Sequence, residues 1–139
     1  IGIPDQILIK PHELEAGEWQ VMRRHPVIWH AILKGSASKY VRMGALIALG
    51  HHEKYDGSGY PNGLVGDHVP LCARIVAVAD VYDALRSVRP YKKAWPSEQA
   101  FEYVRAQSGR HFDPRMVEAF LAARKEVLEV QHEWRDGRA

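Results

Sequence analysis

The sequence predicts an all-α protein: a bundle of about five helices with one long glycine-rich loop. Several segments carry apolar residues at helical spacing, and no two of them make a convincing pair of alternating strands. A length of 139 residues corresponds to one domain. The net charge of +2 and the short apolar runs argue against a nucleic-acid coat and against a protein inserted in a membrane.

The first third of the chain predicts an extended start followed by two helical segments. Residues 1–10 carry a proline and turn residues, so we expect them to be extended. Residues 15–22 have helical character, and residues 27–33 continue it. Pro26 lies between them and is expected to break or restart the helix.

A buried helix and a long loop meet at two adjacent histidines, His51 and His52. Residues 40–49 before them are apolar almost all round, which is typical of a buried helix. Residues 54–70 after them contain four glycines, which predict positive-φ turns or a close approach of the backbone to another group. A loop of this length in a compact domain is usually functional or disordered, and its aromatic residues favour the functional interpretation.

The second half predicts further helices. Residues 75–78 could form a buried parallel strand, but the run 71–85 contains no glycine or proline, and its length favours a buried helix. Ser97 is expected to cap a helix over 98–107. Asp113, followed by a proline, has the pattern of a cap at the start of the last helix.

The histidines are the first candidates for chemistry. Adjacent imidazoles on a helix project about 100° apart, so His51 and His52 would serve different ions of a two-metal cluster. The alternative is that one of them caps the helix through its carbonyl groups. His25, at the helix break, could be aimed inward or lie in a simple turn. The other histidines are expected to be surface or packing residues; they are His12, His30, His68, His111 and His132.

Asp80 and the basic segment after it are the second group of candidates. Asp80 has apolar neighbours, and a carboxylate buried among them would need a metal ion or an arginine as partner. An exposed position at a helix edge is the alternative. Arg89 and Lys92 lie two to three helical turns further on and could bind phosphate, or they could form a solvated basic turn.

The available donor atoms limit the metals. The single cysteine, Cys72, excludes an internal disulfide and a cysteine-rich zinc site and fits a reducing cytoplasm. Imidazoles and a carboxylate without thiolates suit iron, manganese, zinc or nickel. The sequence has no phosphate-binding P-loop and no nucleophilic-serine motif. The residues therefore indicate a two-metal phosphoester hydrolase.

The chain also resembles a known family. Residues 51–64, HHEKYDGSGYPNGL, look like the signature segment of HD-GYP domains, in which Gly59, Tyr60 and Pro61 supply the second half of the name. Further motifs of that family follow in the same order over nearly the whole chain: IGIPD (1–5), Lys10-Pro11, ARIVAVAD (73–80), RPYK (89–92) and FDP (112–114).

This resemblance implies a helical bundle that hydrolyses cyclic di-GMP to linear pGpG or to GMP, with two or three divalent metal ions, typically iron or manganese. It implies metal ligation by His25, His51, His52 and Asp80, with Asp80 and Lys92 taking part in catalysis. Substrate contacts are implied for Arg89, Lys92 and the loop residues Gly59, Tyr60 and Pro61.

The resemblance also implies that residues 1–139 are the C-terminal portion of one HD-GYP domain. The His-Asp motif and its lysine would precede Ile1. A module without catalysis, acting on signalling proteins through the loop, is the alternative, since relatives often carry receiver or sensory domains. Missing upstream helices would leave apolar surface on 40–49 and 71–85, so we expect either a homodimer or partial disorder.

Overall fold

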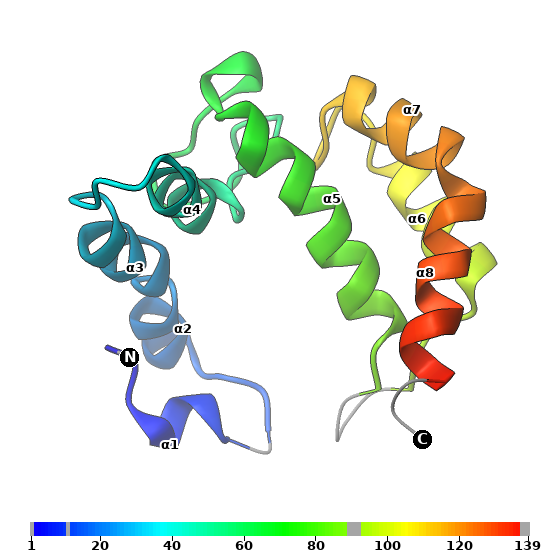
Figure 1. Cartoon of the computed structure of the whole chain (residues 1–139). Coiled ribbons are helices and arrows are strands. Elements are labelled where there is room, and N and C mark those ends of the chain that lie inside the picture. Colours follow the sequence, from blue (N-terminus) through cyan, green and yellow to red (C-terminus); the bar gives the residue numbers. More distant parts are fainter. Residues whose placement is uncertain (1, 11, 89–92, 137–139) are drawn as a thin grey trace.

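The computed structural model describes residues 2–10, 12–88 and 93–136, which form an arch built entirely from helices and loops (Figure 1). The helices are α1 (Asp5–Leu8), α2 (Ala16–Met22), α3 (His25–Leu33), α4 (Lys39–Gly50), a 3₁₀ helix (Gly66–His68), α5 (Leu71–Arg86), α6 (Ser97–Ala106), α7 (Pro114–Ala122) and α8 (Arg124–Asp136). The all-α prediction is confirmed.

The long helix α5 joins two groups of helices. On one side α3 packs against α4, and α4 packs against α5. On the other side α6 and α7 pack against α5 and against each other, and α8 follows α7 (Figure 1). The helix predicted over 71–85 is confirmed, and the strand alternative for 75–78 is wrong.

The compact core lies between α5, α6 and α7. Tyr82 of α5 packs its ring 4.8 Å from that of Phe101 of α6. Phe101, Phe112 and Val104 are buried almost completely, and Val117 of α7 completes the cluster. Burying side chains of this size is the main favourable term in folding, so this half of the arch anchors the other elements.

Several boundaries differ from the sequence predictions. Residues 5–8 form the short helix α1 within the start expected to be extended. Ser97 is the first residue of α6 rather than its cap, because the chain enters that helix from Pro96. The last helical pattern divides at Ala123 into α7 and α8, so the described residues contain more helices than expected.

Helix α4 is less buried than its apolar composition predicted. Ala45 is buried, but Tyr40 is 73% exposed and Met43 is 51% exposed. The reason is that α3 and α5 contact only part of its circumference. Leu71 and Ile75 of α5 are exposed as well, so both helices carry uncovered apolar surface as predicted. The homodimer expected from that surface remains a prediction.

The described part of the chain contains no helix that combines the length and the apolar character needed to cross a bilayer.

Candidate metal centre

Three imidazoles converge where α3 and the end of α4 face each other. His25 is the first residue of α3, His51 is the C-cap of α4, and His52 follows it. One nitrogen of each ring can be chosen so that all three atoms lie within 4.8 Å of one another. The Nε2 atoms of His25 and His52 are 3.1 Å apart. Within the described residues, this is the group of side chains arranged to hold a cation.

Backbone carbonyls fix the orientation of two of these rings. His25 Nδ1 lies 2.7 Å from the carbonyl oxygen of Met22. His51 Nδ1 lies 3.0 Å from the carbonyl oxygens of Ile47 and Ala48. A carbonyl oxygen only accepts, so each Nδ1 carries the proton and each Nε2 keeps its lone pair. His51 therefore caps α4 with one nitrogen and leaves the other available within the imidazole group, and its ligation of a metal remains a prediction.

The third imidazole is held neutral by its surroundings. Burial, followed by the neighbouring rings of His51, His25 and His111, lowers the pKa of His52 to about 3. A metal ion competes with protons for the same lone pairs, so a neutral ring is the form that a metal ligand requires. Three imidazole nitrogen donors fit iron, manganese, zinc or nickel.

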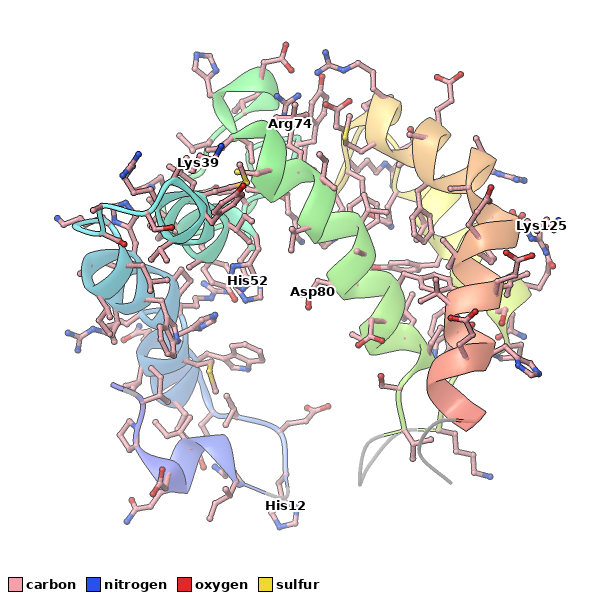
Figure 2. The ribbon with its side chains drawn as sticks, in the orientation of Figure 1. His12, Lys39, His52, Arg74, Asp80 and Lys125 are labelled. Atoms are coloured by element: carbon pink, nitrogen blue, oxygen red, sulfur yellow. The ribbon has the colours of Figure 1, made fainter. Side chains whose placement is uncertain are left out.

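Asp80 lies on the facing helix and outside the imidazole group. Its side chain is exposed on α5, and Figure 2 draws it on the side of that helix that faces His52. Among the described residues, the group within 4.8 Å consists of His25, His51 and His52. The structure thus brings three of the four predicted ligands together, and ligation by Asp80 remains a prediction.

The loop residues Gly59 and Tyr60 lie directly against His52. The Tyr60 ring stacks on the His52 imidazole with 4.8 Å between centroids and 19° between planes. The Tyr60 backbone N–H donates to the His52 carbonyl oxygen at 3.1 Å. A Cβ on Gly59 would lie 2.5 Å from that same oxygen and 2.6 Å from the Glu53 carbonyl carbon. These contacts make the loop a wall of the centre; binding of substrate by the loop, including Pro61, remains a prediction.

Glu53 organises this loop, and the sequence reasoning missed it. Its side chain is buried, with 2% of the residue exposed. The two carboxylate oxygens accept backbone N–H groups from Asn62 at 2.7 Å and from Leu64 at 3.0 Å. The available signal was an acidic residue directly before a loop whose backbone N–H groups lack regular partners.

His111 approaches the centre from a distant part of the chain. Its carbonyl oxygen accepts the Tyr55 N–H at 3.0 Å, and its half-buried ring stacks on Phe112. Burial and the nearby Lys54 ammonium lower the pKa of His111 to about 4. His111 therefore packs against its neighbours, as expected of a surface or packing residue. Its charge interaction with His52 also contributes to the lowered pKa of His52. No local sequence pattern could have shown that approach.

The remaining predicted site residues, Arg89 and Lys92, lie outside the described residues. Their contacts with a phosphate group remain predictions.

Comparison with known proteins identifies one family model and several relatives that are named phosphodiesterases. The family model described as "HD domain" matches residues 1–116. The chain is 56% identical over 130 residues to the cyclic di-GMP phosphodiesterase response regulator RpfG of Xanthomonas campestris, covering 94% of this chain and 34% of that protein. It is 47% identical over 136 residues to a cyclic di-GMP phosphodiesterase of Thermotoga maritima, covering 98% of this chain and 37% of that protein.

Two proteins of Vibrio cholerae extend the comparison. The chain is 46% identical to 3'3'-cGAMP-specific phosphodiesterase 2, covering 94% of this chain and 25% of that protein. A crystal structure of a cyclic GMP-AMP specific phosphodiesterase matches with a TM-score of 0.57 at 22% identity, over 84% of this chain and 25% of that one. At that identity the match shows the fold. The chain spans between a quarter and about two fifths of the length of these relatives.

Proposed function

Because the chain belongs to the HD domain family, we propose that it forms the C-terminal part of a metal-dependent phosphodiesterase domain that hydrolyses cyclic di-GMP. The observation that carries the proposal is the convergence of His25, His51 and His52 where the start of α3 meets the end of α4. The names of the two most identical of these relatives support cyclic di-GMP as the substrate.

The candidate ligands would contribute different donor atoms to the metal ions. His25 and His51 present Nε2 lone pairs because their Nδ1 protons are bound to carbonyl oxygens. His52 contributes a ring that is neutral at neutral pH. Asp80, on the facing helix, would add the charged oxygen ligand that two or three divalent ions need. Iron or manganese fits the resemblance best, and zinc or nickel also accept these donors.

Bound divalent cations would supply a lowered pKa for an attacking water and Lewis acidity towards the phosphoryl oxygens. Arg89 would offer a planar pair of N–H donors to one phosphate, and Lys92 a point charge. Both residues follow α5 in the chain, the helix that carries Asp80. The products we propose are linear pGpG, GMP or both.

Metal analysis with substrate assays tests the proposal. In the protein that contains this chain, His52→Ala and Asp80→Ala are each expected to lower metal content and to abolish hydrolysis of cyclic di-GMP. His12→Ala is the matched control, because that exposed histidine lies far from the centre (Figure 2). Assays with 3'3'-cGAMP in parallel identify the preferred cyclic dinucleotide.

Full metal content and full activity in both variants would overturn the ligand assignment. A wild-type protein that takes up no metal and hydrolyses neither dinucleotide would leave the non-catalytic module, acting through residues 59–70 of the loop, as the remaining function.

A further inference from the structure

The three imidazoles of the centre are held in two different ways. Backbone carbonyl oxygens receive the Nδ1 protons of His25 and His51. In the part of the chain that the structure describes, no carbonyl receives a proton from His52. Its ring contacts the His25 and His51 rings and the face of Tyr60 instead. The plane of His52 therefore depends on where the Tyr60 ring lies.

Tyr60 is in turn contacted by a cation. The guanidinium carbon of Arg23 lies over the Tyr60 ring, 5.2 Å from its centroid. A cation over the negative face of an aromatic ring is attracted to it, so this contact favours the observed position of the phenol ring. The backbone N–H of Tyr60 is already bound to the His52 carbonyl oxygen, which fixes the main chain but leaves the ring to be held by its neighbours.

Arg23 lies in a segment that contacts both His25 and the Tyr60 ring beside His52. It is the C-cap of α2, directly after Met22, whose carbonyl oxygen orients His25. Its own N–H donates to the Trp19 carbonyl oxygen at 2.9 Å, which anchors its backbone to the last turn of α2. The same two-residue segment thus orients His25 through a carbonyl group and reaches His52 through Tyr60.

We propose that Arg23 is a positioning residue: it holds the Tyr60 ring against His52 and so fixes the third imidazole relative to the other two. The inference rests on the proposed metal-binding function of the histidines. Partners that orient a metal ligand without touching the metal contribute to its affinity, because the ligand is then already aligned before binding.

The test compares Arg23→Gln with Arg23→Lys and uses Arg24→Gln, the neighbouring exposed arginine, as control. The first measurement is the nitrogen NMR signals of the His52 imidazole in metal-free protein at pH 7.5. The second is the affinity for Mn²⁺ alone by calorimetry, at unchanged melting temperature. We expect Arg23→Gln to shift the His52 signals and to weaken Mn²⁺ binding about 2- to 5-fold, the range of a partly exposed cation–π contact. Arg23→Lys is expected to keep nearly wild-type His52 signals and Mn²⁺ affinity. Arg24→Gln is expected to change neither.

Wild-type His52 signals in Arg23→Gln would overturn the proposal. Because those signals are recorded without metal, they decide the role of Arg23 even if the wild-type protein binds no Mn²⁺, a result that would count against the proposed function instead. If Arg23→Gln does not fold, Tyr60→Phe and Tyr60→Leu test the contact through which Arg23 is proposed to act: the first is expected to keep the stacked ring and the His52 signals, and the second to lose both. Equal His52 signals in these two variants would refute the proposal.

Discussion

The carboxylate of Glu53 accepts the backbone N–H of Leu64 at 3.0 Å, across a separation of 11 residues. Its other oxygen accepts the Asn62 N–H at 2.7 Å. One buried side chain, next in sequence to His52, therefore closes the loop that covers the imidazole group. The shape of the centre depends on this acid, which is not itself one of its candidate ligands.

Replacing Glu53 by alanine is expected to lower the free energy of unfolding by about 2–4 kcal/mol, because two partly buried N–H groups lose their carboxylate acceptors. Glu53→Gln keeps the side-chain shape and one acceptor oxygen, so its free energy of unfolding is expected to fall by less than that of the alanine variant. Urea denaturation of both variants measures the difference. Equal stability of the alanine variant and the wild type would show that the loop is closed by other contacts.

Gly59 is expected to tolerate no side chain. A Cβ there would lie 2.5 Å from the His52 carbonyl oxygen, so the main chain beside the candidate ligand must shift. We expect Gly59→Ala to cost about 1–3 kcal/mol and to weaken Mn²⁺ binding. Gly17→Ala is the matched control, because the same Cβ on α2 would meet no atom within 4 Å. That change is expected to be neutral or to stabilise by up to about 1 kcal/mol. Thermal unfolding and Mn²⁺ titration of the pair check the expectation.

Asp113 connects α7 to α5. Its buried carboxylate caps α7 through the Arg115 N–H and accepts the Arg74 guanidinium of α5 at 2.6 Å. Asp113→Ala is expected to destabilise by about 3–5 kcal/mol, since it removes a cap and leaves a nearly buried cation without its main partner. Asp67 also contacts Arg74, but its side chain is 69% exposed, so Asp67→Ala is expected to cost under about 1 kcal/mol. Chemical denaturation that gave the two variants the same stability would contradict this ranking.

Stability is expected to fall on acidification in two steps. The pKa of His111 is lowered to about 4 and that of His52 to about 3, mainly by burial. Between about pH 6.5 and those values the unfolded chain binds more protons than the folded one, so folding loses stability as the pH falls. Interaction with Arg115 lowers the pKa of Asp113 to about 2, so its contribution, present above about pH 4, is lost below that.

Urea denaturation of the metal-free protein from pH 7.5 to pH 2 follows both steps. His111→Gln is expected to flatten the upper part of the curve, because it removes one of the two groups that titrate there. If the free energy of unfolding of this variant depended on pH as steeply as that of the wild type, a group other than His111 would be titrating in this range.

The sequence by itself determined the helical class, the family and the positions of most helices, because these depend on local periodicity and on motifs that are contiguous in the chain. Residues 71–85 were assigned to a helix by length alone, and the motif at 51–64 located the loop and two histidines of the centre. Caps and helix ends were less well determined: Ser97 was expected outside α6 and lies within it.

Only the tertiary structure decided which side chains meet. It brought His25 to His52 across 27 residues, placed Arg23 over Tyr60, and left the Asp80 carboxylate exposed on the facing helix. The physical reason is that such contacts depend on how helices pack against one another, and packing angles are set by the whole core rather than by any one segment. The residue types indicate a metal site, but only the structure shows how the candidate side chains are arranged around it.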